Sequence, residues 1–188
     1  MSPLEIVAVI FSVLAVTLTV KRHILCWLFN FIAAAVYGYV FYSYQLYAET
    51  FLQSFFMLMS VYGFLTWQKT AADSHVNVQH MVLKVAFVQI ALTAILGFSF
   101  GLCLHYFTQA SLPLLDAQLV AFSLLATYWA SRKYLATWGL WIILDVIYVG
   151  MFIYKELFLT AVLYAGFVGL AFWGFRQWQH SSLKSAKN

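Results

Sequence analysis

The chain consists mainly of long apolar stretches separated by short segments that carry charges, prolines or clustered polar residues. Each stretch approaches or exceeds the roughly 20 residues that an α-helix needs to cross a bilayer. None of them alternates polar and apolar residues in the way that the strands of a membrane β-barrel do. The pattern predicts seven membrane-spanning helices, at residues 4–20, 24–42, 46–67, 81–107, 114–131, 135–154 and 157–177.

Composition strengthens this prediction. Of the 188 residues, 64% are hydrophobic and 9% are charged, against roughly 45–50% and 25% in soluble proteins. So little polar surface cannot cover a compact body in water. We therefore predict an all-α, polytopic membrane protein in which residues 1–188 form a single transmembrane domain. The first stretch lacks the charged start and cleavage site of a signal peptide, so we expect it to be a retained helix.

The basic residues fall almost entirely on one side of this seven-helix arrangement. Lys and Arg in short loops stay on the cytoplasmic side of a membrane, which predicts an outside N-terminus and a cytoplasmic C-terminus. The net charge of +4 then reflects a rim that faces lipid headgroups, and no nucleic-acid partner is expected. Nine of the ten basic residues belong to this rim, all except Lys155: Lys21, Arg22, Lys69, Lys84, Arg132, Lys133, Arg176, Lys184 and Lys187.

An internal repeat relates the two halves of the chain. Shifting residues 21–68 by 111 positions onto 132–179 gives eleven identities in 48 positions, including rare Trp and Gly matches at its ends. Chance similarity between two aromatic-rich segments is the alternative, but duplication is favoured. The identical pairs are Trp27/Trp138, Ile32/Ile143, Tyr37/Tyr148, Phe41/Phe152, Leu46/Leu157, Leu52/Leu163, Phe56/Phe167, Gly63/Gly174, Phe64/Phe175, Trp67/Trp178 and Gln68/Gln179.

Both copies carry a basic pair at their start, so they have the same orientation. Three helices can repeat in parallel only if an extra helix returns the chain across the membrane. We therefore expect a 3+1+3 parallel repeat: a first three-helix bundle at 4–67, a linker helix at 81–107 and a second three-helix bundle at 114–178. Transporters with such repeats bind their substrate between the halves, near the middle of the bilayer.

Polar residues inside the spans mark the candidate site, because each is costly in hydrocarbon unless it faces protein or water. The sixth span carries four such residues spaced three, four and three apart, hence on one helix face. The other candidates lie in the second, third and seventh spans. Together the candidate substrate-binding residues are Trp138, Trp141, Asp145, Tyr148, Gln53, Glu49, Asn30 and Tyr164.

Several polar and aromatic residues of the spans, inside and outside this candidate set, have simpler interpretations. Trp27, Trp67 and Trp178 lie near span ends and are expected to be interfacial anchors, and Asn30 or Gln53 could hydrogen-bond neighbouring helices. The two acids are harder to explain in this way, because the basic residues within the spans, Lys84 and Arg176, lie at span ends, and none lies in a span interior to neutralise Asp145 or Glu49. Binding of a cation or a proton is the simplest account.

The absence of basic residues from the span interiors also limits the kind of ligand that the site can bind. A phosphorylated molecule would require Arg or Lys clamps or a glycine-rich phosphate loop, and the spans have neither. Aromatic rings beside carboxylates suit a flat, positively charged heterocycle without phosphate. The chain has no motif for a metal, a cofactor or ATP, and we expect none of them.

Two segments carry a family resemblance. The run WGLWIILDVIYVGMFIYKELFLTAVLY, starting at Trp138, resembles the WxxWxxxN signature of the PnuC family of bacterial vitamin-precursor transporters. The segment from Asn30 through QLYAETFLQSFF to YGFLTW is similar to the first-half element of that family. The resemblance implies the 3+1+3 fold, a homotrimer in the bacterial inner membrane, and uptake of nicotinamide riboside by facilitated diffusion. It also implies roles in binding for Trp138, Trp141, Asp145, Gln53 and Asn30.

The chain departs from the family pattern by having Asp145 where the signature has Asn, and by placing Glu49 in the third span. A carboxylate can accept a hydrogen bond from an aminopyrimidine, which makes thiamine the alternative substrate, with riboflavin behind it. Coupling to protons through either acid stays open. An intramembrane enzyme is the alternative from another class, but HExxH and nucleophile-elbow motifs are absent, so we expect no catalytic residues.

Overall fold

The computed structural model describes residues 3–43, 47–72, 78–107 and 112–185, without the side chains of 47–49, 70–72 and 184–185. These ranges form seven α-helices and contain one isolated β-bridge, between Gln79 and Tyr134. The helices are α1 (Pro3–Val20), α2 (Leu25–Ser43), α3 (Tyr47–Ala72), α4 (Leu83–Phe107), α5 (Pro113–Ser131), α6 (Ala136–Tyr154) and α7 (Phe158–Ser185).

The predicted helices are confirmed in number and nearly in extent. Twelve of the fourteen predicted ends lie within two residues of the observed ones, and only the ends of α3 and α7 lie further along the chain. Six helices are long and apolar enough to cross a membrane by length and composition, and α3 is not among the six. Gln53, Gln68 and Lys69 contribute to the lower hydropathy of α3.

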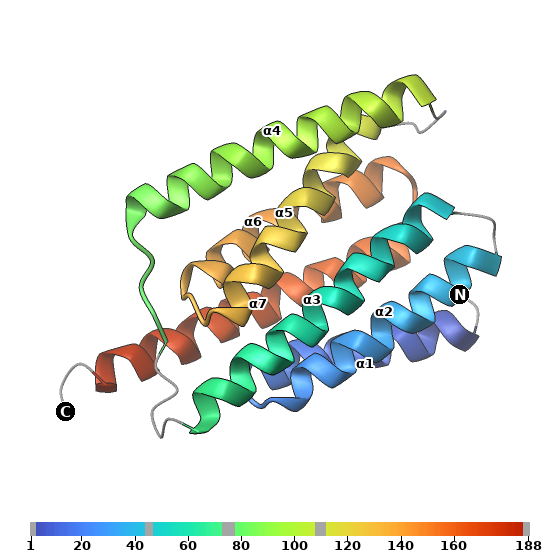
Figure 1. Cartoon of the computed structure of the whole chain (residues 1–188). Coiled ribbons are helices and arrows are strands. Elements are labelled where there is room, and N and C mark those ends of the chain that lie inside the picture. The colour runs from blue at the N-terminus through green and yellow to red at the C-terminus, as the bar shows by residue number, and fades with distance from the viewer. Residues whose placement is uncertain (1–2, 44–46, 73–77, 108–111, 186–188) are drawn as a thin grey trace.

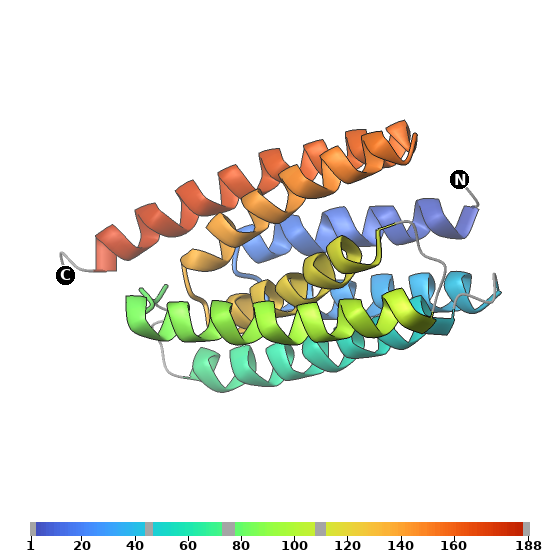
Figure 2. The same ribbon diagram turned by 90° about the horizontal axis from the view of Figure 1, so that it is seen from above.

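The helices run roughly along one common direction, and the two chain ends lie at opposite ends of the molecule (Figure 1). α1 packs on α2 and α2 on α3, whereas α6 packs on both α5 and α7. Contacts of α1 with α7 and of α3 with α5 join these two groups. α4 lies along the outside and packs on α5 (Figures 1 and 2).

Glycines allow α4 to approach α5 closely. A Cβ atom on Gly97 would come within 2.9 Å of Gln118, and one on Gly101 within 3.0 Å of Leu114. Two side-chain hydrogen bonds also join these helices, from Gln118 Nε2 to the carbonyl of Ala94 (2.9 Å) and from Trp129 Nε1 to Gln89 Oε1 (2.6 Å). The helix predicted as a linker is therefore attached to α5.

Three helices end in the same way. In α1, α5 and α6, the second residue after the last helical one has a positive φ: 56° at Arg22, 57° at Lys133 and 59° at Glu156. The next residue donates its backbone N–H to a carbonyl five positions back, as His23 does to Leu18 at 2.9 Å. This is the Schellman arrangement, which usually has glycine at the positive-φ position. Arg22 and Lys133 are 111 residues apart, at what we call the basic end of the molecule.

Two tryptophan pairs fill the core at the basic end. Trp27 meets Trp67 edge to face with centroids 5.5 Å apart, and Trp138 meets Trp178 in the same way at 5.3 Å. All four side chains are at most 3% exposed. The expectation that Trp27, Trp67 and Trp178 are interfacial anchors is therefore wrong, because other helices cover them. Hydropathy cannot distinguish a ring that faces lipid headgroups from one that faces a neighbouring helix.

Two glycines make room for the inner rings of these pairs. A Cβ atom on Gly63 would lie 2.5 Å from the Trp27 ring, and one on Gly174 would lie 2.6 Å from the Trp138 ring. Real Cβ atoms essentially never come this close to another heavy atom. Each glycine is thus required for packing at these two positions.

The outer indoles complete helix ends. Trp67 Nε1 lies 3.3 and 3.1 Å from the carbonyl oxygens of Ala130 and Ser131 in the last turn of α5. Trp178 Nε1 lies at the same distances from those of Thr19 and Val20 in the last turn of α1. The carbonyls of Ala130 and Thr19 also accept the backbone N–H groups of Lys133 and Arg22. Since a helix leaves its last carbonyls without partners in regular helical bonds, each indole adds a bond at a helix end that the backbone satisfies only in part.

Candidate functional site

A cavity of about 200 Å³ lies where α1, α2, α5, α6 and α7 meet. No described residue of α3 or α4 lines it. Polar groups and aromatic rings share its wall. The lining residues are Ser12, Val16 and Thr19 of α1, Asn30 of α2, Thr127 and Ala130 of α5, Trp138, Trp141 and Asp145 of α6, and Tyr164, Phe167 and Ala171 of α7.

Five of the eight candidate residues lie together in this wall: Asn30, Trp138, Trp141, Asp145 and Tyr164. The other three do not line it. Tyr148 lies behind Tyr164, with ring centroids 4.8 Å apart, and its hydroxyl is 3.5 Å from Ser123 Oγ. Gln53 is half-buried beside Gly38 of α2. The Glu49 side chain lies outside the described part of the structure.

The hydroxyl groups in the wall donate to their own helices. Ser12 Oγ donates to the carbonyl of Ala8 at 2.9 Å, and Thr19 Oγ1 donates to that of Ala15 at 2.8 Å. Thr127 Oγ1 donates to the carbonyl of Ser123, also at 2.8 Å. Because a hydroxyl has one proton and two lone pairs, these three groups can offer only acceptors to a ligand.

Asp145 adds a carboxylate to these acceptors. It is 4% exposed, and the described residues give it no hydrogen bond or ion pair. The ion pair that the described chain does contain joins Lys155 to Asp116 at 3.2 Å, at the opposite end from the basic end. None of the lining residues is Lys or Arg. The cavity is therefore rich in acceptors and suited to a cation.

Aromatic residues form much of the rest of the cavity wall. Trp138 and Trp141 come from successive turns of α6, and Tyr164 and Phe167 from α7. The buried Trp138 Nε1 has no hydrogen-bond partner within the described structure. The wall thus combines ring faces, which attract flat cations, with residues that carry N–H donors, namely Asn30, Trp138 and Trp141.

Sequence reasoning missed several members of this wall. Thr19, Val16, Phe167 and Ala171 line the cavity but resemble ordinary span residues. Ser12 and Thr127 were recognisable, since Ser12 lies 111 positions before Ser123 and Thr127 follows one turn later. The repeat was therefore the signal that could find hydroxyl positions near the cavity.

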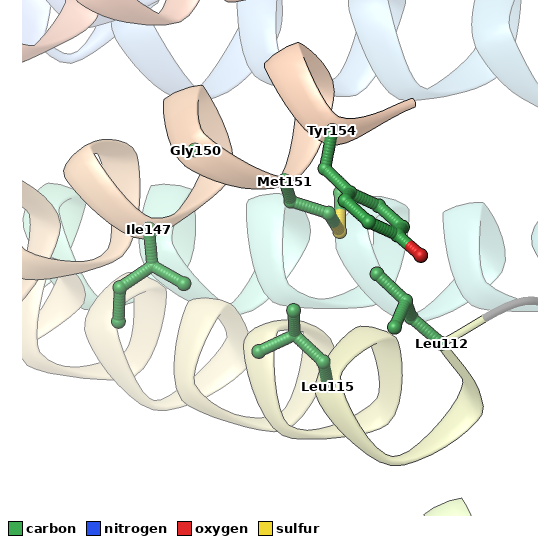
Figure 3. Close-up of a pocket in the computed structure, with 6 residues that line it drawn as sticks. All are labelled: Leu112, Leu115, Ile147, Gly150, Met151 and Tyr154. Atoms are coloured by element: carbon green, nitrogen blue, oxygen red, sulfur yellow. The ribbon is translucent and has the colours of Figure 1, made fainter. Parts of the chain in front are cut away.

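A second hollow lies at the opposite end of the molecule, between the start of α5 and the end of α6. It is larger, about 390 Å³, and is lined by Leu112, Leu115, Ile147, Gly150, Met151 and Tyr154. Figure 3 shows the aliphatic side chains of both helices gathered around it, with the Tyr154 ring at one side. It lacks the converging polar groups that orient a ligand, so the cavity beside Asp145 is the candidate site.

Known proteins similar to this chain are transporters. The nicotinamide riboside transporter PnuC of Escherichia coli (strain K12) is 22% identical over 97% of this chain and 87% of its own length. That of Neisseria mucosa is 26% identical over 77% of this chain and 57% of its own length. The riboflavin/roseoflavin transporter RibM of Streptomyces davaonensis is 22% identical over 97% of this chain and 87% of its own length.

A solved structure and a family model agree with these similarities. The crystal structure of the vitamin B3 transporter PnuC superposes with a TM-score of 0.75 at 22% identity, covering 96% of this chain and 82% of that one, so the two share a fold. The family model described as nicotinamide mononucleotide transporter matches residues 2–180. The chain belongs to this family of membrane transporters.

Proposed function

We propose that the protein transports nicotinamide riboside across the membrane and binds it in the cavity beside Asp145. The observation that carries the proposal is the composition of the wall: one carboxylate, three acceptor hydroxyls, several aromatic rings and no Lys or Arg. Nicotinamide riboside has a flat cationic ring, a carboxamide and ribose hydroxyls. These groups supply the positive charge that the wall lacks and donors for its carboxylate and hydroxyl oxygens.

The wall favours a riboside over a phosphorylated mononucleotide. A phosphate would be placed near Asp145 without a cation to balance it, and burial of unpaired like charges is strongly unfavourable. The relatives in Escherichia coli and Neisseria mucosa are named for nicotinamide riboside. The family description names the mononucleotide, which differs by one phosphate from the substrate that we propose.

Thiamine is the second candidate, and Asp145 is the observation in its favour. The carboxylate can accept a hydrogen bond from an aminopyrimidine and attract the thiazolium ring. Riboflavin ranks third despite the similarity to RibM, because its ring has no positive charge for the carboxylate to attract.

The proposal includes the architecture expected from the repeat. We infer seven spans in a 3+1+3 arrangement, with the basic end in the cytoplasm of a bacterial inner membrane and the N-terminus outside. The paired positions Gly63/Gly174, Trp27/Trp138 and Arg22/Lys133 support two related bundles. The homotrimer rests on the family resemblance, and the mass of the purified protein in detergent would test it.

The charge of Asp145 provides the sharpest test of the proposed substrate. Nicotinamide riboside is cationic, whereas its dihydro form is neutral and has nearly the same shape. In equilibrium binding to the purified protein, we expect Asp145→Asn to lower the affinity for the cationic form about tenfold, since a hydrogen bond to a charged group contributes roughly 1.5–3 kcal/mol. The neutral form should change little. Equal effects on both forms would contradict charge recognition.

Binding of thiamine, riboflavin and nicotinamide mononucleotide should be measured in the same way. We expect micromolar binding of the riboside and at least tenfold weaker binding of the mononucleotide, by the argument from phosphate charge above. Uptake into proteoliposomes with and without a pH gradient then tests facilitated diffusion. Equilibration that is independent of the gradient is the expected result, and accumulation driven by it would instead indicate proton coupling.

A further inference from the structure

We propose that Trp67 and Trp178 form a reciprocal latch that closes the basic end of the cavity, and that Trp178 couples this closure to the bound substrate. The coupling rests on the proposed function, but the latch itself can be tested without any ligand. Both indoles act as positioning residues, because neither of them lines the cavity.

The latch joins the two helix groups in both directions. Trp67 of α3 donates to the last turn of α5, and Trp178 of α7 donates to the last turn of α1. Each donor thus belongs to one group and its acceptors to the other. The contacts between α3 and α5 and between α1 and α7 are also the places where the two groups meet. Any separation of the groups at this end must break at least one of the two ties.

The ties lie directly beside the cavity. Thr19 and Ala130 line its wall, and their carbonyl oxygens are among the four that the indoles bind. Between the ties, the rings of Trp67 and Trp178 approach each other with centroids 6.5 Å apart. A substrate that leaves toward the basic end must therefore part these rings and the helix ends that they hold.

Only one of the two indoles packs on a ring that lines the cavity. Trp178 packs edge-on against Trp138, which lines the cavity. Trp67 packs in the same geometry against Trp27, which does not. A ligand that presses on the Trp138 ring is thus one ring contact away from the bond between Trp178 and α1. Trp67 lacks such a ring contact with the wall, while each indole has one acceptor in the wall, Ala130 for Trp67 and Thr19 for Trp178, so Trp67 is a matched control.

The chain contains its own reporter of opening. Cys26 is 0% exposed and belongs to the same apolar cluster as the four tryptophans. The other cysteine, Cys103, is exposed on α4 and would be replaced by Ala. In the full chain in lipid nanodiscs, the rate at which a small maleimide labels Cys26 then follows the population of the open form.

Trp67→Phe and Trp178→Phe each remove one N–H donor and keep an aromatic ring. We expect each substitution to raise the labelling rate about fivefold, the factor that corresponds to the roughly 1 kcal/mol of a typical hydrogen bond. Unchanged labelling in both variants would overturn the latch. Size-exclusion profiles and melting temperatures close to those of the parent would show that the increase reflects opening and not unfolding.

Nicotinamide riboside tests the coupling. We expect the riboside to slow Cys26 labelling in the parent and in Trp67→Phe, and to have little effect in Trp178→Phe. Equal protection in both variants would overturn the coupling and leave the latch intact. If the parent binds neither the riboside, thiamine nor riboflavin, the proposed function fails, while the comparison of labelling rates without ligand still decides the latch.

A measurement on the unsubstituted chain keeps the coupling testable if a variant does not fold. Hydrogen–deuterium exchange should slow with bound riboside at the backbone amides of residues 21–23 and 132–134, resolved from overlapping peptides. None of these residues lines the cavity, so slower exchange there would reflect closure of the basic end and not contact with the ligand. Exchange that slows at neither helix end in the presence of bound riboside would overturn the coupling.

Discussion

Trp27 and Trp138 have the same surroundings but different positions relative to the cavity. Each ring lies over a glycine, meets a second tryptophan edge to face, and leaves its buried N–H without a partner in the described structure. Only Trp138 lines the cavity. The packing at the basic end is therefore repeated in the two halves, whereas the contribution to the cavity wall is not.

Other positions 111 residues apart show the same division. Asp145 corresponds to the buried Ala34, and Tyr164 corresponds to Gln53. Asn30 and Trp141 correspond to each other, and both line the cavity. If the halves arose by duplication, the scaffold kept its matching residues while the second half acquired the carboxylate and most of the aromatic wall. Experiments on matched pairs can test this difference.

The largest effects are expected from removing each inner tryptophan. Trp27→Leu and Trp138→Leu should each lower the free energy of unfolding by about 3–5 kcal/mol, because both leave a large core cavity. Only Trp138→Leu should weaken binding of the riboside, by about 10- to 100-fold, through loss of ring stacking. Thermal unfolding and equilibrium binding of both variants test this. Equal loss of binding would show that stability, and not contact with the ligand, explains the effect.

Substitution of the glycines beneath these rings should produce the same difference between the two halves, with smaller effects. Gly63→Ala and Gly174→Ala each force a methyl group against a packed ring, which should cost about 1–3 kcal/mol of stability. We expect only Gly174→Ala to reduce affinity, by about three- to tenfold, because the ring that it displaces lines the cavity. The same two measurements apply. Reduced affinity in Gly63→Ala would contradict the asymmetry between the halves.

Most of the fold was predictable from the sequence, and the exceptions have physical causes. Apolar stretches predict only the part of a helix that is suited to a bilayer, whereas α3 and α7 continue to Ala72 and Ser185 because polar residues can extend a helix into water. Five of eight candidate site residues line the cavity because costly polar groups inside a span must face protein or water. The Trp67 and Trp178 bonds could not be predicted, since they join residues more than 60 and 150 positions apart.

The basic end offers a comparison that depends on pH. Burial, together with the nearby Arg22 charge, lowers the pKa of Lys133 to about 8. The Trp67 ring, whose centroid lies 5.1 Å from Nζ, favours the charged form but does not outweigh burial. The folded protein then binds fewer protons than the unfolded chain between pH 8 and about 10.5, so stability should rise with pH in this window.

We expect a gain of about 1–2 kcal/mol in the free energy of unfolding between pH 8 and 9.5. Melting temperatures of the parent and of Lys133→Met measure it. The substitution should remove this rise, whereas Arg22→Gln should remove only the smaller part that is due to repulsion between the two cations. A rise that persists unchanged in Lys133→Met would assign the titration to another group.

The smallest effect is expected at the opposite end, where Glu156 ends α6 with the same positive φ as Arg22 and Lys133. A left-handed conformation costs a non-glycine residue about 1 kcal/mol, and Glu156 is exposed, so glycine removes the strain without removing buried contacts. Glu156→Gly should therefore raise the melting temperature by about 2–4 °C, as expected for roughly 1 kcal/mol in a chain of this size.

Glu156→Ala is the control, because it removes the charge and keeps the strained Cβ. If alanine stabilises as much as glycine, the charge of Glu156 and not its backbone conformation limits stability at this helix end. If neither substitution raises the melting temperature, other contacts already offset the strain at this helix end. The same conformation at Arg22 and Lys133 would then need no functional explanation.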